Sequence, residues 1–303
     1  MNGSATASHL SYEAGPTVEF FADSPLGLER CRRLLDVIGV RARPLGSLAE
    51  ANAALAAGAA ADAVLLDLTE DPGAALDELL DRIEDGAAGN SFRSVVSISS
   101  TLLDCTTARL QSAGVALLCD TGEIEAAAAL GLALAIPRQG LREKGEEAEL
   151  RRLSEEVNRI ARALAQLSTA QEPAAPLTLA RAPVVPGTLP SAATLRMTLR
   201  ARRMRDQYFT PDLFADPAWD MLLDLMLARL EGRTVAVSSL CIAAAVPPTT
   251  ALRWIKRLTD EGVFVRTADP RDGRRVFIDL SEAAANSMAS YFNALERIGT
   301  TLA

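Results

Sequence analysis

Along residues 17–136, short apolar runs alternate with stretches in which apolar residues recur every three or four positions. The apolar runs, of which VEFF (18–21) and ADAVLLDLT (61–69) are the clearest, predict buried strands. The stretches between them predict amphipathic helices, including one over TLLDCTTARLQSAG that ends at Gly114. Five such strand–helix repeats predict an α/β domain in which helices cover both faces of a five-stranded parallel sheet.

From Glu146 the spacing of apolar residues becomes regular at three and four positions, with charged residues between them. This pattern predicts a coiled-coil helix over residues 137–170, and with it a parallel homodimer. The alternative, which stays open, is an amphipathic helix that packs on its own domain. The seam of the predicted coiled coil consists of Leu150, Leu153, Val157, Ile160, Leu164 and Leu167.

The segments that flank these regions carry little periodicity. Residues 171–190 contain five prolines and several alanines, which predicts an extended Pro/Ala-rich linker. Residues 1–16 lack the basic start and apolar core of a signal peptide, so we expect a flexible leader. No apolar run reaches the roughly 18 residues that a membrane helix needs, and no membrane partner is expected.

Residues 191–303 predict a further domain, which begins with a basic helix and continues with a helix capped by Asp216. VSSLCIAAAV (237–246) predicts a short helix with Ser238 or Ser239 as its cap. A proline break separates it from TTALRWIKRLTDEG, and two short helices with a tight break are the helix-turn-helix pattern. Two strands around an arginine-rich loop follow, and a last helix begins near Glu282. The domain is therefore predicted to be an α+β winged helix-turn-helix.

The predicted recognition helix (249–262) and wing (267–276) carry the candidate chemistry of this domain. Ala251, Leu252, Ile255 and Leu258 form an inward stripe, which leaves hydroxyl and basic side chains on the other faces. Hydroxyls and an arginine in the first turn suit a helix that enters the major groove of DNA. The candidate DNA-binding residues are Pro248, Thr249, Thr250, Arg253, Lys256, Arg257, Arg271, Arg274 and Arg275.

Charge and composition narrow the possible functions. The net charge is −8, but residues 1–136 hold 8 Lys/Arg against 19 Asp/Glu, whereas residues 191–303 hold 15 against 13. Only residues 191–303 are therefore expected to bind a polyanion such as a nucleic acid. The four cysteines lie far apart without a CxxC pair, and the one histidine is His9. We therefore expect that the protein is not an enzyme and binds neither a cofactor nor zinc. We also expect it in the reducing cytoplasm, associated with the nucleoid.

In VLLDLTEDPG, FFADSP and VVSISS, residues 17–136 resemble the receiver domain of bacterial response regulators, a flavodoxin-like fold. The resemblance implies that Asp67 is the phosphoacceptor, that Asp23 helps to hold Mg²⁺, and that Ser99 follows the phosphoryl group. Two positions depart from that family, because Ala22 replaces a metal-binding acid and LLCDTGE lacks the expected lysine. No metal site is expected beyond a weakened Mg²⁺ candidate at Asp23 and Asp67.

Over about residues 216–298, and above all in DEGVFVRTADPRDGRRVFIDLSEAA, the chain resembles the MarR-type transcriptional regulators. The resemblance implies a winged helix that binds double-stranded DNA. It also implies that Asp269 braces a wing arginine, with Arg271 and Arg275 on the wing signature. Trp254 in the recognition helix is unusual for that family, and we expect it to pack against the wing rather than to touch the DNA backbone.

Together these observations predict a homodimeric transcription regulator that reads duplex DNA, with the receiver-like domain used for dimerisation or for a regulatory partner protein. One alternative is a phosphorelay response regulator that is phosphorylated on Asp67. Another is a DNA-organising protein with little sequence preference. The dimer interface could lie in the coiled coil, the receiver-like domain or the winged helix.

Overall fold

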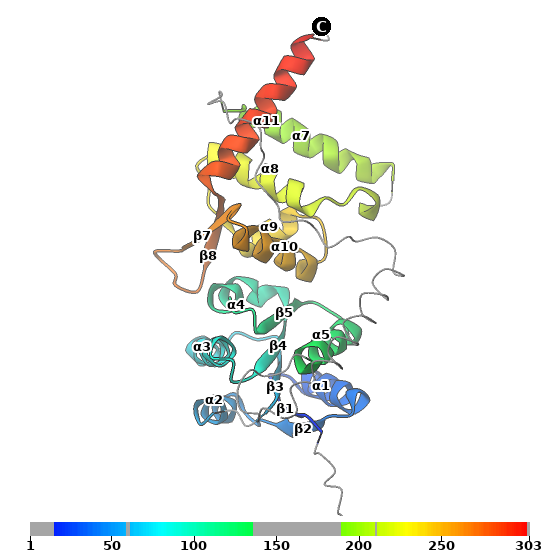
Figure 1. Ribbon diagram of the computed structural model, residues 1–303, viewed down its shortest axis with the longest axis vertical. Coiled ribbons are helices and arrows are strands. Elements are labelled where there is room, and N and C mark those ends of the chain that lie inside the picture. The colour runs from blue at the N-terminus through cyan, green and yellow to red at the C-terminus, as the bar shows by residue number, and fades with distance from the viewer. Residues whose placement is uncertain (1–14, 59–60, 136–188, 210, 302–303) are drawn as a thin grey trace, which may run out of the picture. The chain divides into compact units, whose positions relative to one another are not determined.

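The computed structural model describes residues 15–58, 61–135, 189–209 and 211–301 (Figure 1). The chain divides into two compact units, Met1–Pro137 (unit 1) and Arg138–Ala303 (unit 2). The predicted coiled coil and its seam lie outside the described residues, as do nearly all of the predicted leader and linker. Within the described part of the chain, no helix is both long and apolar enough to cross a membrane.

Unit 1 contains one parallel sheet with the strand order β2-β1-β3-β4-β5, which is the order of flavodoxin-like folds. Helices α2, α3 and α4 cover one face of the sheet, and α1 and α5 cover the other (Figure 1). The prediction of a five-stranded parallel sheet is thus confirmed. The elements are β1 (Thr17–Ala22), α1 (Pro25–Ile38), β2 (Arg41–Pro44), α2 (Leu48–Ala56), β3 (Ala63–Leu68), α3 (Ala74–Ala88), β4 (Arg93–Ile98), α4 (Leu103–Arg109), β5 (Val115–Cys119) and α5 (Glu123–Ala135).

The core of unit 1 is built around β3, which is buried along its whole length. On one face of the sheet, Phe20 and Leu65 pack with Leu35 of α1 and Leu130 of α5, all of them almost completely excluded from solvent. A strand buried on both faces is what a continuous apolar run produces in a parallel sheet. Cys31, Cys105 and Cys119 are buried in this unit and form no disulfide.

Helix α4 ends at Arg109, so the prediction of a helix that runs to Gly114 is wrong. Leu110 has an extended backbone conformation, which ends the helix. The N–H groups of Gln111 and Ser112 then both donate to Oε2 of Glu84 on α3, at 3.0 Å. Because a neighbouring helix satisfies these N–H groups, the chain leaves the helix without losing hydrogen bonds.

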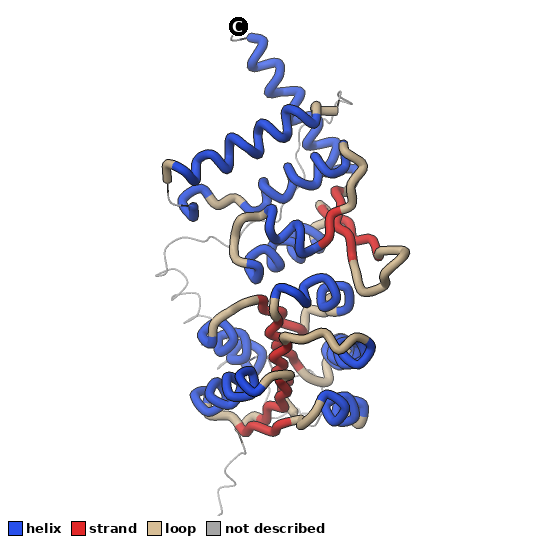
Figure 2. Tube along the Cα trace, turned by 180° about the vertical axis from the view of Figure 1, so that it is seen from behind, coloured by secondary structure: helices blue, strands red, loops and turns tan. Residues whose placement is uncertain are grey.

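Unit 2 is an α+β winged helix-turn-helix, as predicted (Figure 2). Its three-stranded antiparallel sheet has the order β6-β8-β7. The elements are α7 (Ala192–Met204), the short helices η2 (Arg205–Gln207) and η3 (Pro211–Phe214), α8 (Pro217–Leu230), β6 (Val235–Ala236), α9 (Val237–Ala243), α10 (Pro248–Asp260), β7 (Phe264–Ala268), β8 (Val276–Leu280) and α11 (Glu282–Thr301).

Two helix caps were predicted in unit 2, and the structure confirms the first and contradicts the second. Asp216 caps α8, because its side chain accepts a hydrogen bond from the N–H of Trp219 at 3.2 Å. Helix α9, by contrast, begins at Val237 with Ala236 as its cap, so neither Ser238 nor Ser239 has that role. Strand β6 pairs with β8 up to Ala236 and passes directly into the helix, which places both serines inside its first turn.

Candidate nucleic-acid interface

Helices α9 and α10 are joined by a turn whose backbone breaks the first helix and starts the second. Ala245 has a φ of 52°, in the left-handed region, and this ends α9. Pro247 then precedes α10 in an extended conformation, and Pro248 occupies the first helical position. Proline suits that position because the first N–H groups of a helix have no partner within it. The sequence VPP therefore sets the break between the two helices.

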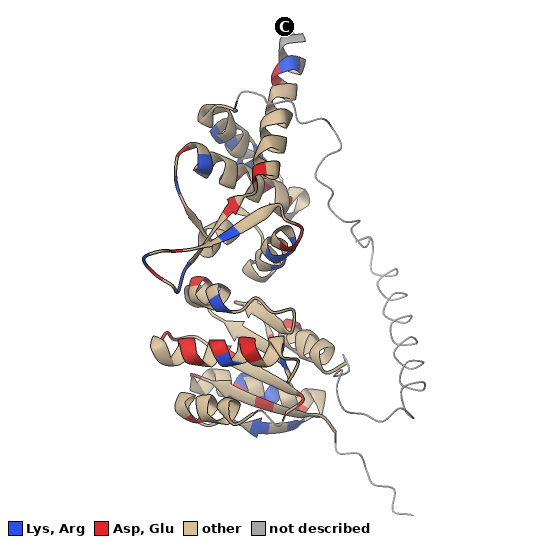
Figure 3. Ribbon diagram, turned by 60° about the vertical axis from the view of Figure 1, so that its left-hand side comes forward, with Lys and Arg blue, Asp and Glu red and all other residues tan. Residues whose placement is uncertain are grey.

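Helix α10 has one apolar face and one basic face. Ala251, Leu252, Ile255 and Leu258 are buried, which confirms the predicted inward stripe. Arg253 and Lys256 are exposed on the remaining surface, and the first-turn residues Pro248, Thr249 and Thr250 are half-buried. In Figure 3 the Lys and Arg positions of this helix and of the wing loop are coloured blue.

Two of the basic side chains on α10 are held by neighbours on the same helix or by its C-cap residue, Glu261. The guanidinium of Arg257 lies 5.3 Å from the centre of the Trp254 ring, and its Nε is 3.0 Å from Oε1 of Glu261. Lys256 Nζ lies 3.9 Å from Asp260. Trp254 thus packs on a basic side chain of its own helix, a contact that the sequence did not predict. A guanidinium fixed in this way keeps its charge but loses side-chain freedom before any ligand binds.

The wing is the β7–β8 hairpin with a loop over residues 269–275. Its two aspartates fold the loop through the backbone: Oδ1 of Asp269 accepts from the N–H of Arg271 at 2.9 Å, and Oδ1 of Asp272 accepts from the N–H of Arg274 at 3.0 Å. The N–H of Asp269 also donates to the carbonyl of Arg275 at 3.0 Å. Asp269 therefore braces the backbone of an arginine. The side chains of Arg271 and Arg275 are exposed, and Arg274 is half-buried.

An arginine that belongs neither to the recognition helix nor to the wing supports the base of the wing. Arg229 of α8 donates from Nη1 to the carbonyl of Leu280 at 3.1 Å and pairs with Glu282 at the start of α11. This contact ties the end of β8 to the scaffold helix. The sequence did not indicate it, because Arg229 lies on a helix whose pattern suggests only core packing.

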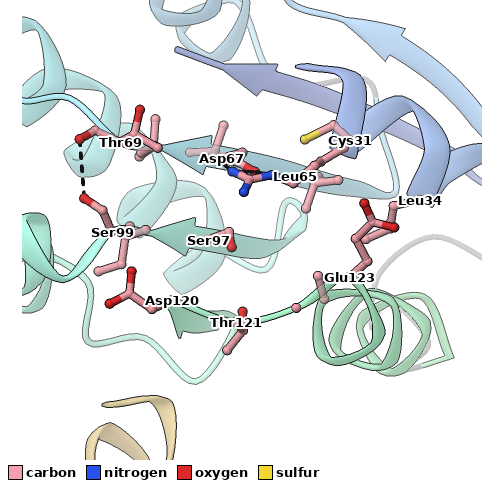
Figure 4. A pocket seen from close by; sticks show the side chains of 16 residues that line it. Cys31, Leu34, Leu65, Asp67, Thr69, Ser97, Ser99, Asp120, Thr121 and Glu123 are labelled. Carbon is pink, nitrogen blue, oxygen red and sulfur yellow. Dashed lines mark hydrogen bonds and ion pairs between the residues drawn. The ribbon is translucent and has the colours of Figure 1, made fainter. Parts of the chain in front are cut away.

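Unit 1 has a separate polar pocket at the carboxyl ends of β3, β4 and β5, with a cavity volume of about 120 Å³ (Figure 4). Asp67 lies at its centre, and both of its carboxylate oxygens accept hydrogen bonds from Arg30 of α1, at 2.8 Å and 2.9 Å from Nη2. Ser99 and Asp120 also line the pocket. Asp67, which the resemblance to receiver domains implied to be a phosphoacceptor, is therefore paired with an arginine of the same chain.

The second candidate metal ligand, Asp23, is engaged with the loop that follows β3. The Asp23 carboxylate accepts from the N–H groups of Thr69 and Glu70, at 2.5 Å and 2.7 Å, and from the hydroxyl of Thr69. In the described part of the chain, no group of three or more His, Cys, Asp or Glu residues could hold a metal ion. With Asp67 paired to Arg30 and Asp23 holding a loop, these residues do not fit a Mg²⁺ site.

Replacing Asp67 with asparagine is expected to change the pH dependence of stability. Burial raises the pKa of Asp67 above its usual range, against the opposing effect of Arg30, so its ionised form lowers stability at neutral pH. That cost disappears as the pH falls below about 4, where the carboxyl group is protonated in both the folded and the unfolded chain. We expect Asp67→Asn to be at least as stable as the natural chain at pH 7, with a difference that shrinks toward pH 4.

Urea unfolding followed by far-UV circular dichroism between pH 4 and pH 7.5 would measure this difference. Asp36→Asn is the matched control, because Asp36 is exposed on α1 and its replacement should give a small and nearly constant effect. A stability difference for Asp67→Asn that grows as the pH falls would contradict the assignment.

The comparisons with known proteins add distant likenesses to solved structures. No family model matches the chain, and no curated protein matches it. S. aureus MepR bound to ethidium bromide is 16% identical, with a TM-score of 0.26 over 37% of this chain and 80% of that one. The transcriptional regulator Tm0710 from Thermotoga maritima is 23% identical, with a TM-score of 0.24 over 37% and 79% of the two chains.

A structure of Bordetella bronchiseptica BpsR, described in terms of the regulation of its DNA binding by 6-hydroxynicotinic acid, is 21% identical. Its TM-score is 0.23, over 36% of this chain and 83% of that one. These structures are MarR-family winged-helix regulators, and they lend no support to the receiver-like resemblance of residues 17–136. At such identities and scores, the comparisons assign the chain to no family.

Proposed function

We propose that the protein is a transcription regulator that binds duplex DNA through the winged helix of unit 2. The observation that carries this proposal is the division of α10 into a buried apolar face and a basic face, next to a wing on which Arg271 and Arg275 are exposed. Helix-turn-helix proteins insert their second helix into the major groove, and here both that helix and the wing carry basic side chains.

The proposed roles follow from where each side chain lies. Helix α10 has 13 residues, so it is roughly 20 Å long and can lie along the major groove. Thr249, Thr250 and Arg253 in its first turns would reach base edges, because hydroxyls bond bases or phosphates and arginine pairs with guanine. Positively charged side chains farther along α10 and on the wing would contact phosphates, which positions the protein but carries no sequence information.

We further propose that the protein acts as a homodimer, which would match a DNA site with two half-sites. The end of α11 leaves Tyr291, Leu295 and Ile298 exposed at spacings of four and three, so they lie on one side of the helix. An apolar stripe of this kind suits a second copy of the chain. The coiled coil predicted over residues 137–170 is the alternative interface, and unit 1 would then serve as a docking module for a regulatory protein.

Selection of duplex DNA from a random pool with the full-length protein would test this function. Arg253→Ala is expected to weaken binding to the preferred sequence about tenfold and to relax base preference, because a base contact is lost. Arg271→Ala is expected to weaken binding to all sequences and to make the salt dependence shallower by about one phosphate contact. Arg200→Ala, which removes an exposed charge from α7, is the control.

Unchanged binding in both Arg253→Ala and Arg271→Ala would refute the assignment of these elements to DNA. A selected pool with no sequence preference would favour the DNA-organising alternative instead.

A further inference from the structure

The last carbonyl of α9 lies at the turn that orients the recognition helix. The final carbonyl groups of a helix have no donor within it and must find one elsewhere. Ala243 is the last residue of α9, and the chain turns away at Ala245. Since Pro247 and Pro248 have no N–H, the turn itself offers few donors for the carbonyl of Ala243.

A side chain from α7 supplies that donor. Nη2 of Arg203 donates a hydrogen bond to the carbonyl oxygen of Ala243, forty residues along the chain. Nη1 of the same guanidinium lies 3.8 Å from Oδ2 of Asp220 on α8. One arginine thus connects three helices: the helix that carries it, the scaffold helix and the first helix of the helix-turn-helix.

The chemistry of the contact suits a fixed geometry. A guanidinium is planar and presents its donors in a rigid fork, so the hydrogen bond to Ala243 has a set direction while the same group stays within ion-pair distance of Asp220. A positive charge at the carboxyl end of a helix also interacts favourably with the helix dipole. Asp220 keeps a second partner, because Nε of Arg202 lies 2.5 Å from its Oδ1. Loss of Arg203 would therefore release the end of α9 without leaving Asp220 unpaired.

We propose that Arg203 is a positioning residue for DNA recognition, which holds the carboxyl end of α9 and thereby fixes the direction in which α10 leaves the turn. The inference rests on the proposed DNA-binding function, although the contact itself involves no DNA. Arg203 lies outside both the recognition helix and the wing. Its expected effect on DNA is therefore indirect, through the orientation of Thr249, Thr250 and Arg253.

The first test needs no DNA. In the full-length protein, Arg203→Ala is expected to speed hydrogen–deuterium exchange about tenfold at the amides of residues 244–246 and 249–251, because a charged hydrogen bond that holds the turn is lost. Amides in the middle of α8 should keep their natural exchange rates. Arg200→Ala removes the same charge from the same helix at an exposed position and should leave the turn unchanged. Natural exchange at the turn in Arg203→Ala would overturn the proposal.

The second test separates positioning from direct contact. Arg203→Ala is expected to bind the preferred duplex about tenfold more weakly, with unchanged affinity for unrelated DNA and an unchanged salt slope. General destabilisation of the domain would not produce this split at a temperature far below unfolding. Equal losses on both DNAs with a shallower salt slope would show that Arg203 contacts phosphate, and would overturn the proposal. If the natural protein binds no DNA, the proposed function fails, and the exchange experiment still decides what Arg203 does.

Discussion

Replacing Asp220 with alanine is expected to lower the free energy of unfolding of unit 2 by about 3–5 kcal/mol. Asp220 is only 4% exposed, and Nε of Arg202 lies 2.5 Å from its carboxylate. The Arg202 side chain is itself 16% exposed, so removal of the carboxylate would leave a largely buried guanidinium with only Asp216, 4.0 Å from its Nη2, as a counter-charge. Breaking one side of a buried ion pair costs more than the pair contributes, because the remaining charge cannot regain its hydration.

Tryptophan fluorescence can follow this unfolding in the full-length chain, because both tryptophans, Trp219 and Trp254, lie in unit 2. Asp206→Ala is the control, since it removes an exposed carboxylate from the same region. The double replacement Arg202→Met with Asp220→Leu should be far less damaging than Asp220→Ala alone, because no charge remains to be buried. If Asp220→Ala unfolds like the control, the ion pair does not stabilise the domain.

Replacing Gly86 with alanine is expected to destabilise unit 1 by about 3 kcal/mol, although alanine is the better helix former. Gly86 lies inside α3, and a Cβ added there would overlap the ring of Phe92, well inside van der Waals contact. Phe92 is 3% exposed and cannot move aside without disturbing the core before β4. The steric cost should therefore exceed the roughly 1 kcal/mol gained from helix propensity.

Gly131 provides a control of opposite sign. It also lies inside a helix, α5, but nothing lies within 4 Å of an added Cβ, so Gly131→Ala should stabilise unit 1 by up to about 1 kcal/mol. Combining Gly86→Ala with Phe92→Leu should recover part of the loss, because the smaller side chain removes the overlap. Far-UV circular dichroism in urea would measure all three variants. A stabilised Gly86→Ala would show that the packing of α3 against Phe92 is looser than the structure indicates.

The pattern of apolar and polar residues was sufficient to predict most helices and strands and part of the candidate site. The buried strand β3 and the amphipathic helix α10 each reveal themselves by the spacing of apolar residues, which is local information. The end of α4 and the cap of α9 could not be found in this way. The first depends on Glu84 from another helix, and the second on the pairing of β6 with β8.

The same distinction applies to the side chains around the candidate sites. The basic residues of α10 and the wing are close together in sequence, so their clustering was visible before the structure. Arg30, Arg203 and Arg229, by contrast, donate hydrogen bonds to residues that are 37, 40 and 51 positions away along the chain. No local motif marks such contacts. In particular, the pairing of Asp67 with Arg30 could not be predicted from the motif around Asp67.

Because buried cysteines lie in both units, their reaction with an alkylating reagent can report which unit unfolds. Burial and the neighbouring Asp67 raise the pKa of Cys31 to about 12, so this thiol is protonated and unreactive in the folded chain. Cys105 and Cys119 are also buried in unit 1, whereas Cys241 is buried in unit 2. A pulse of alkylating reagent would therefore mark each unit only during the time it spends open, and peptide masses would tell the two openings apart.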